Sequence, residues 1–341
     1  MVVAYTWPHL FGFKRNAMKR LTTTLLNGTL LCAVLCFVAC DDDDKLPEAK
    51  KDPVEISGDN QNANPTNVDE SYGRLEFPRL KGDGSSVVLV RRVPNFGINY
   101  AIEYDRRKRM QRWTCWQWYR GNSGSAWSRN NWDYEADNNP WVRLNIQTYG
   151  FSDPFQPDPD LEIDERVELD EYKNCPFQRG HICASADRLN SKEANEQTFY
   201  LSNIMPQSSG LNNGVWQSME NHVRNHWNND AFRRVLYVVK GGTIDQDNMI
   251  RTYTSTGLPV PKYFFMALLC EDQQGGYKAL AFWVEHTDRQ IKDARLKDYV
   301  INISRLQELT GIDFFCNLPD AVEEEVESAA KTQIISDWEL N

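Results

Sequence analysis

The spacing of apolar residues predicts three β-strands between residues 87 and 118. Each run is short and alternating or aromatic, which is typical of strands that pack on a core: VVLVRRV at residues 87–93, YAIEY at 100–104 and WTCWQW at 113–118. The basic segment 105–112 (DRRKRMQR) joins the last two runs. We expect this segment to be a solvated hairpin tip, and contact with nucleic acid is the alternative.

A further strand and a helix are predicted in the middle of the chain. The run FYLSNIM at residues 199–205 is apolar and ends at Pro206, which is typical of a buried strand. From Leu211 onward the apolar positions follow the helical period of about 100° per residue. They form one stripe, made of Val215, Trp216, Met219, Val223 and Trp227.

Three polar residues are predicted to share one side of that helix. At about 100° per residue, Asn212, Glu220 and Arg224 fall within one arc of about 120°. An amide, a carboxylate and a guanidinium can therefore point into a single space. Taken one at a time, Asn212 is a helix N-cap and Glu220 a solvated charge. Only their joint spacing supports a functional hypothesis.

Three more strands are predicted after the helix, at residues 234–241, 263–270 and 277–284. The last two are expected to pair through the Gly-rich turn at 274–276. Residues 141–170, in contrast, are rich in Pro and Asp and show no period. We expect them to form a long loop.

The first 40 residues are predicted to be a lipoprotein signal peptide that takes no part in the fold. Basic residues precede an apolar stretch at 25–39, and Met18 is an alternative start because MKRLTTTLL opens as a bacterial signal does. The stretch ends in FVAC, which is similar to a lipobox with Cys40 as the lipidated residue. Because about fifteen residues are short for a single-pass anchor, we expect export and attachment to the outer membrane through lipid on Cys40.

The polar segment that follows is predicted to be a tether. Residues 41–85 hold few groups that can be buried, which indicates a flexible linker, and the folded domain is expected at 86–341. The acidic run 41–44 either resembles the surface-export signal of some Gram-negative lipoproteins or is a plain solvated run. Location at the cell surface is therefore left open.

The net charge of −10 is unexpected for a protein that binds nucleic acid. Residues 1–40 contribute +4 and residues 41–70 contribute −7, which leaves −7 for residues 71–341. Much of this charge lies in 153–171, where nine acids accompany one arginine. Contact with a polyanion would therefore depend on a local basic groove and not on the overall charge.

Residues suited to catalysis concentrate between positions 178 and 224. In chain order they are Gln178, Arg179, Gly180, His181, Asn212, Trp216, Glu220 and Arg224. Their order and spacing resemble the DNA/RNA non-specific endonucleases of the ββα-metal superfamily, relatives of endonuclease G. The signature of that family is Asp-Arg-Gly-His, followed by Asn-x-x-x-Trp and then Glu. Gln178 is the one departure, because the family usually has Asp there.

The resemblance covers residues 87–327 and implies a fold and an activity. The fold would be α+β, of the ββα-metal (His-Me finger) type, mainly an antiparallel sheet flanked by helices. The activity would be that of an endonuclease that depends on Mg²⁺, with Mn²⁺ as an alternative, and hydrolyses phosphodiester bonds in DNA and RNA. Hydrolysis needs a deprotonated water and counter-charge for the phosphorane and the leaving alkoxide.

The resemblance also assigns a role to each candidate residue. His181 would be the general base, since an imidazole titrates near neutral pH. Asn212 would bind the metal through its side-chain oxygen, and Glu220 would orient water bound to that metal. Arg179 and Arg224 would bind phosphate through their planar guanidinium groups.

A further arginine comes from the segment WSRNNW at residues 127–132. This segment is similar to an Arg-Asn-Trp element of the family, whose Arg reaches the scissile phosphate. Arg129 is the matching candidate, although the alignment needs one extra residue before Trp132.

Five of the eight cysteines remain after the signal and the lipidated Cys40 are set aside: Cys115, Cys175, Cys183, Cys270 and Cys316. In an exported protein they allow at most two disulfides and one free thiol. Cys270 and Cys316 are expected to pair first, because both end apolar runs.

Zinc is the alternative metal hypothesis. His222 and His226 lie four apart on the predicted helix, and Cys175 and Cys183 lie upstream. However, seven residues separate the two cysteines, whereas structural zinc sites space them by two to four. A solvated helix edge explains the histidines more simply.

Two functions without catalysis remain open. One is a nucleic-acid-binding surface lipoprotein that keeps the nuclease fold but has lost activity with the acid at position 178. The other is an adhesion or scaffold protein with a residual motif. The presence together of His181, Asn212 and Glu220 argues against both, since neither function has a physical reason to keep a base and a metal ligand.

Overall fold

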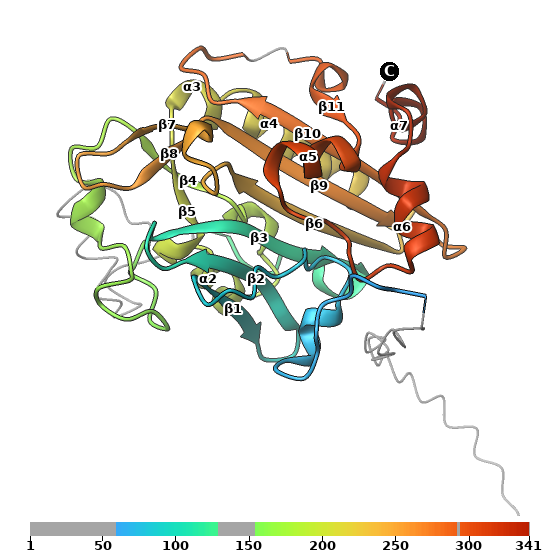
Figure 1. The fold of residues 1–341 in the computed structure, drawn as a ribbon, viewed down its shortest axis with the longest axis horizontal. Helices are drawn as coiled ribbons and strands as arrows, with labels where there is room; N and C mark the ends of the chain where they lie inside the picture. Colours follow the sequence, from blue (N-terminus) through green and yellow to red (C-terminus); the bar gives the residue numbers. More distant parts are fainter. Residues whose placement is uncertain (1–58, 129–153, 292–293, 341) are drawn as a thin grey trace, which may run out of the picture. The chain divides into compact units, whose positions relative to one another are not determined.

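The computed structural model describes residues 59–128, 154–291 and 294–340 of the 341-residue chain (Figure 1). Its main element is a seven-stranded antiparallel sheet in the order β1-β2-β3-β6-β9-β10-β11. The strands are β1 (Ser86–Val93), β2 (Gly97–Asp105), β3 (Met110–Trp118), β6 (Val235–Gly242), β9 (Tyr263–Glu271), β10 (Tyr277–Glu285) and β11 (Val300–Ile301).

Two small sheets and several short helices complete the fold. The small sheets pair β4 (Gln178–His181) with β5 (Ile204–Gln207) and β7 (Ile250–Tyr253) with β8 (Pro259–Pro261). The α-helices are α2 (Lys192–Gln197), α3 (Ser209–Asn212), α4 (Val215–His222), α5 (Ile303–Thr310), α6 (Asp320–Glu327) and α7 (Lys331–Asp337). A π-helical turn, η7 (Val223–Trp227), extends α4. The 3₁₀ turns are η1 (Glu70–Gly73), η2 (Arg120–Asn122), η4 (Leu169–Tyr172), η5 (Ser185–Asp187), η6 (Leu201–Asn203), η8 (Asp247–Met249) and η9 (Leu296–Tyr299).

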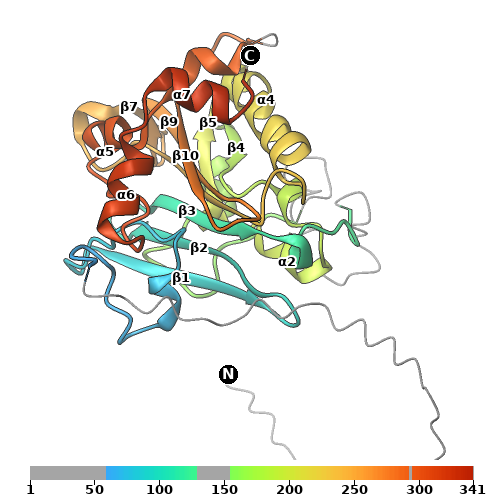
Figure 2. The same cartoon turned by 90° about the vertical axis from the view of Figure 1, so that its right-hand side faces the viewer.

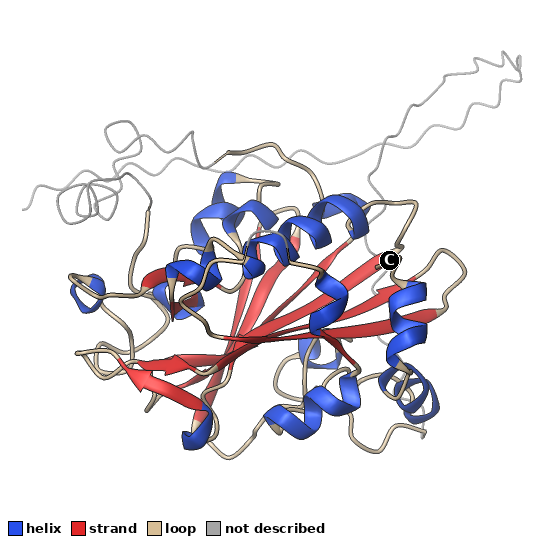
Figure 3. Cartoon of the chain, turned by 90° about the horizontal axis from the view of Figure 1, so that it is seen from above, coloured by secondary structure: helices blue, strands red, loops and turns tan. Residues whose placement is uncertain are grey.

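Side chains of the large sheet alternate between two cores. Along β6, Leu236 and Val238 belong to one core, whereas Tyr237 and Val239 belong to the other. Residues of α4, β5 and α7 cover the first core, and residues of α5 and α6 cover the second. Figure 2 accordingly shows α4 on the opposite side of the sheet from α5 and α6, and Figure 3 shows helices on both faces. The sheet is thus buried on both sides.

The antiparallel sheet flanked by helices confirms the predicted α+β architecture. All six strands predicted at the two ends of the domain are present, and β9 pairs with β10 around the predicted turn. Of the helices in the described part of the chain, none is long and apolar enough to cross a membrane.

The strand predicted at residues 199–205 is shorter and later than expected. Only Ile204 and Met205 belong to a strand, β5, while residues 201–203 form η6. The cause is Asn203, whose side chain binds the backbone of Cys183 and the carbonyl of Thr198. These bonds replace the ladder that a longer strand would need.

The helix predicted from Leu211 onward is interrupted. Gly214 has φ −117° and ψ −119°, outside the helical region, and separates α3 from α4. The buried stripe of α4 and η7 is confirmed, because all five of its apolar residues are buried. Asn212, however, lies on a different helix from Glu220 and Arg224, so the prediction that one helix carries all three was wrong.

Part of the predicted tether is folded. Residues 59–85 are described, and within them Leu75 and Phe77 are buried in the second core. Asn60 and Asn64 make hydrogen bonds with the 316–318 segment near the C-terminus. These asparagine side chains form hydrogen bonds with backbone groups and so anchor residues 59–85, although the segment has the polar composition of a linker. The domain therefore begins at or before residue 59 and not at 86.

The predicted disulfide between Cys270 and Cys316 was wrong. All five cysteines of the described chain are free thiols. Cys270 contributes to the first core, whereas Cys316 lies at the second core beside the carbonyl of Phe77. Because the sheet separates the two thiols, they cannot approach to bonding distance.

The basic tip between β2 and β3 is only partly solvated. Arg106 and Arg107 are exposed, but Arg109 forms an ion pair with Glu171. Arg112 is buried within β3, where it contacts Glu103 and Asp245. The positive charge that the sequence placed at this tip is therefore largely neutralised by neighbouring carboxylates.

Candidate active site

The β4–β5 pair places Arg179 and His181 on one face of a short strand. Residues two apart on a strand share a face, and both side chains contact the ring of Phe155. The guanidinium carbon of Arg179 lies 3.8 Å from the centre of that ring, and the imidazole of His181 lies 5.3 Å from it. His181 also meets the ring of Phe199 edge to face at 5.0 Å. Aromatic packing therefore fixes both the candidate base and the first candidate phosphate ligand.

Gly180, between these two residues, leaves room for the side chain of Gln207. A Cβ atom added there would lie 2.2 Å from Cδ of Gln207, whose buried side chain occupies the space on the opposite face of β4. Any larger residue would therefore force the Gln207 side chain to move.

Gln178, on the other face of β4, connects this strand to α3. Its Oε1 accepts hydrogen bonds from Nδ2 of Asn212, at 2.9 Å, and from Nδ2 of Asn213, at 3.2 Å. Because Nδ2 of Asn212 donates to Gln178, the side-chain oxygen Oδ1 of Asn212 remains available as an acceptor. No donor among the described residues reaches that oxygen.

Helix α3 is itself tightly placed. Its N-cap is Ser208, whose hydroxyl accepts from the backbone N–H of Leu211 and whose own N–H donates to Nε2 of His286 at 2.7 Å. At Gly210, an added Cβ would lie 2.1 Å from the carbonyl oxygen of Asp288. The close backbone contact and the histidine fix the helix that carries Asn212.

Glu220 and Arg224 lie on consecutive turns of α4 and η7, and each contacts an oppositely charged group. Lys240 Nζ, from β6, is 2.8 Å from Oε1 of Glu220. Arg224 contacts Oδ1 of Asp187, from η5, through Nε at 2.8 Å and Nη2 at 2.7 Å. Lys240 is also 3.8 Å from Oδ2 of Asp187, so the four side chains form one group of alternating charge.

Burial raises the pKa of the Glu220 carboxyl above its ordinary value, and the neighbouring Asp187 adds to this rise. Lys240 and Arg224 oppose it, because a nearby cation favours the carboxylate. The pKa of Arg224 is raised, first by Asp187, so this guanidinium stays charged. The group can therefore present both a carboxylate and a cation at the end of α4.

Comparison with known proteins identifies the family of this chain. The model of a family described as "DNA/RNA non-specific endonuclease" matches residues 88–321, which is more than half of the chain. The chain belongs to the DNA/RNA non-specific endonuclease family.

Individual relatives are distant. The chain is 26% identical over 238 residues to a nuclease of Nostoc sp., which covers 67% of this chain and 75% of the relative. It is 28% identical over 238 residues to the mitochondrial nuclease EXOG of Xenopus laevis, which covers 65% of this chain and 58% of the relative. A solved complex of EndoG with its inhibitor EndoGI has 20% identity and a TM-score of 0.51 over 67% of this chain and 86% of that one. This last likeness confirms the nuclease fold.

Within the endonuclease family the site of this chain has an amide where a carboxylate is usual, at Gln178. Mg²⁺ takes few protein oxygens and keeps most of its waters. The Oδ1 atom of Asn212, held in place through Gln178, is an oxygen donor of the kind that such an ion prefers. The residues present therefore fit a hard divalent cation.

The zinc alternative is not supported. Among the described residues, the one group of three or more potential ligands close enough for a metal is Asp313, Glu323 and Glu327, which contains neither histidine nor cysteine. His222 and His226 instead stack on each other, with 4.5 Å between ring centres.

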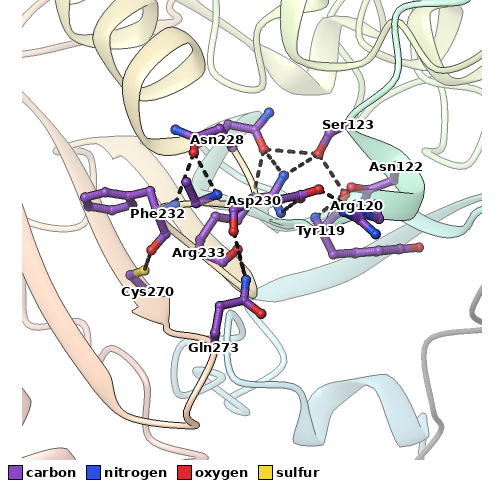
Figure 4. A network of polar contacts seen from close by, with 12 residues as sticks. Tyr119, Arg120, Asn122, Ser123, Asn228, Asp230, Phe232, Arg233, Cys270 and Gln273 are labelled. Atoms are coloured by element: carbon purple, nitrogen blue, oxygen red, sulfur yellow. Dashed lines mark hydrogen bonds and ion pairs between the residues drawn. The ribbon is translucent and has the colours of Figure 1, made fainter.

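The remaining candidate, Arg129, lies outside the described residues, as do residues 141–153 of the predicted loop at 141–170. The chain leading to it is anchored by the polar network of Figure 4. There Arg233, from the loop after η7, donates to Ser123 at 2.7 Å and to Asn228 at 2.6 Å, while Arg120 contacts Asp230. The loop that leads to Arg129 therefore starts from a position fixed against the end of the central helix.

Asp187 and Lys240 were missed by the sequence analysis. A lysine within the apolar run RVLYVVKG was a usable signal, because a charge in a buried strand requires a partner. Asp187 gave no comparable signal, since nothing in the sequence around it shows that η5 turns toward α4.

Proposed function

We propose that this chain is a divalent-metal-dependent nuclease that hydrolyses phosphodiester bonds in both DNA and RNA. The observation that carries the proposal is the placement of the candidate residues on neighbouring elements. Strand β4 bears Arg179 and His181, and its residue Gln178 holds Asn212 on α3. Helix α4 and the turn η7, which follow α3 in the chain, bear Glu220 and Arg224. Membership in the endonuclease family gives that arrangement its chemical meaning.

His181 is proposed as the general base. It accepts a proton from the attacking water, and its packing between Phe155 and Phe199 restricts the ring to one orientation. Glu220, as a carboxylate, accepts hydrogen bonds from water in the site and thereby orients it.

The cation is proposed to be Mg²⁺, with Mn²⁺ as the alternative, held through Oδ1 of Asn212. When bound, such an ion supplies positive charge to the phosphorane and to the departing alkoxide. Arg179 and Arg224 add fixed positive charge for the phosphate oxygens, and Arg129 is proposed for the scissile phosphate.

We also propose that the nuclease is exported and anchored by lipid on Cys40, with residues 41–58 as the linker to the folded domain. The apolar stretch before Cys40 and its lipobox-like end support this. Cys40→Ser should abolish labelling with radioactive palmitate and move the protein to the soluble fraction. Sedimentation with membranes that persists in this variant would instead show an uncleaved anchor.

The test of activity is release of acid-soluble nucleotides from plasmid DNA and from RNA. Release is expected with Mg²⁺ or Mn²⁺ and is expected to stop with EDTA. A nucleic-acid-binding protein without catalysis is the alternative, and the amide at Gln178 is the observation in its favour. Such a binding protein would shift the mobility of both DNA and RNA in a gel but would release no nucleotides from either with Mg²⁺ or Mn²⁺.

A further inference from the structure

Four charged side chains of alternating sign lie behind the exposed end of α4, in the order Glu220, Lys240, Asp187 and Arg224. The inner two are closed off from solvent, since 2% of the Lys240 side chain and 1% of that of Asp187 is exposed. The outer two keep 14% and 22% exposure for Glu220 and Arg224. The inner pair therefore cannot touch a nucleic acid, whereas the outer pair can.

The ammonium group of Lys240 is buried among aromatic rings. It projects from the middle of the large sheet between two indole rings, with Nζ 5.1 Å from the centre of Trp116 and 5.5 Å from that of Trp216. A buried ammonium requires an anionic partner, and Glu220 is the one within hydrogen-bond distance. Because a buried ion pair adds little net stability compared with apolar packing, its main effect here is on the charge and orientation of Glu220.

We propose that Lys240 is a positioning residue for catalysis, which keeps Glu220 ionised and directed into the site while Asp187 does the same for Arg224. This inference rests on the proposed nuclease function. It adds a residue at a buried strand position that the family signature seen in the sequence does not include.

Among the described residues, three charged groups face Glu220, each from a different element. Lys240 approaches from β6, Asp187 from η5 and Arg224 from η7, and the buried Cys183 and Arg188 lie beside Asp187. Burial and Asp187 raise the pKa of Glu220, and the two cations lower it. Without Lys240, the partly exposed Arg224 would serve both the buried Asp187 and the largely buried Glu220, so the pKa of Glu220 should rise.

The first test is the pH profile of kcat/KM for Lys240→Met. Because a cation within hydrogen-bond distance lowers the pKa of a carboxyl, its loss should move the acidic limb of the profile up by about 1–3 pH units. Activity near pH 6 should fall roughly tenfold for each pH unit by which the limb moves, and most of it should return at high pH. An equal loss at every pH would show a merely structural role and overturn the proposal.

Lys278→Met is the matched control. Lys278 also lies on the large sheet, over the rings of Phe232 and Trp338, but its Nζ donates to the carbonyl of Asp337 and not to Glu220. Its pH profile should match that of the unmodified chain. Lys240→Gln, which keeps a donor but not the charge, should shift the limb as Met does, whereas Lys240→Arg should restore it. A Lys240→Gln variant with an unshifted limb would contradict the role of the charge.

A second readout needs no metal and no activity. In EDTA, the free energy of unfolding is measured against pH for the unmodified chain and for Lys240→Gln. A carboxyl whose folded pKa is raised binds its proton more tightly in the folded state, so its contribution to stability is lost as pH rises. The deficit of Lys240→Gln should therefore grow as pH rises above the unfolded pKa of the carboxyl, and Glu220→Gln in the same chain should remove this growth.

The two readouts separate the two proposals. If the unmodified chain releases no nucleotides, the proposed function fails, yet the unfolding measurement still decides whether Lys240 controls the charge of Glu220. A pH-independent deficit in EDTA would overturn the coupling even in an active nuclease.

Discussion

The two halves of the candidate site are held together by different forces. In the amide half, made of Gln178, Asn212 and Asn213, neutral side chains hold the proposed metal ligand. In the charged half, made of Asp187, Glu220, Arg224 and Lys240, four buried or partly buried charges alternate in sign.

The difference shows where this chain places its negative charge. A carboxylate at position 178 would attract a cation over several ångströms, whereas an amide only orients its neighbour. In this chain the carboxylates lie instead in the charged half, where Lys240 and Arg224 neutralise them. Cation binding should therefore depend on the geometry of the Asn212 oxygen and should be weaker than in a site with a carboxylate.

The largest effect is expected from His181→Ala, which leaves both halves intact. Loss of a general base lowers kcat by roughly 10²–10⁴, while the melting temperature and the affinity for Mg²⁺ measured by calorimetry should stay nearly unchanged. Cleavage at the parental rate would show that His181 is not the base.

The sequence predicted six strands of the large sheet well, because alternation of apolar residues is a local signal. It also predicted Glu220 and Arg224 on one side of a helix, since they are four residues apart. It failed where distant segments decide the structure. Gly214 breaks the helix because residues 288–291 pack against α3, and no local pattern shows that contact.

The same limit explains the other corrections. Asn60 and Asn64 have the composition of a linker, and only the fold shows that their side chains meet the 316–318 segment. Cys270 and Cys316 both end apolar runs, yet only the fold shows that Cys270 belongs to the first core while Cys316 lies in a turn at the second. Lys240 within an apolar run was a signal that went unused, and its partner Glu220 could be assigned only from the fold.

The next largest effect is expected from a substitution in the amide half. Asn212→Ala removes the proposed metal oxygen and should weaken Mg²⁺ binding by at least the roughly 10–100-fold that loss of a supporting residue costs. Part of the activity should return at high Mg²⁺. Asn213→Ala is the matched control, because Asn213 also donates to Gln178 but is exposed. Calorimetry that shows equal Mg²⁺ affinity for both variants would contradict the assignment.

Gln178→Asp would make the amide half charged and so reduce the difference between the halves. A nearby charge in a partly screened site is worth up to about 1–2 kcal/mol, so Mg²⁺ affinity or kcat should rise about tenfold. Asp keeps an oxygen acceptor for Asn212, although its side chain is shorter. If the parent chain is inactive with Mg²⁺ and Mn²⁺ and Asp restores nothing, the binding-protein alternative is favoured.

The smallest effect on activity is expected from His286, which contacts the N-cap of α3 and acts on stability. Burial lowers the pKa of His286, so the folded state prefers the neutral ring, whose Nε2 accepts from the N–H of Ser208. The unfolded state binds the proton more readily, and stability is therefore present above about pH 6.5 and is lost as pH falls below it. The charged half should behave in the opposite way, because the pKa of Glu220 is raised.

His286→Leu and His286→Gln separate the contribution of the hydrogen bond from Ser208 from that of the titration of the ring. The Leu variant leaves the Ser208 N–H without an acceptor and should lower the free energy of unfolding by about 1–3 kcal/mol at neutral pH. The Gln variant keeps an acceptor but cannot titrate, so its loss of stability in acid should be smaller than that of the parent chain. Denaturant unfolding in EDTA at several pH values measures both. Parallel pH curves for the parent and the Gln variant would show that His286 stays neutral in acid or that α3 does not depend on it.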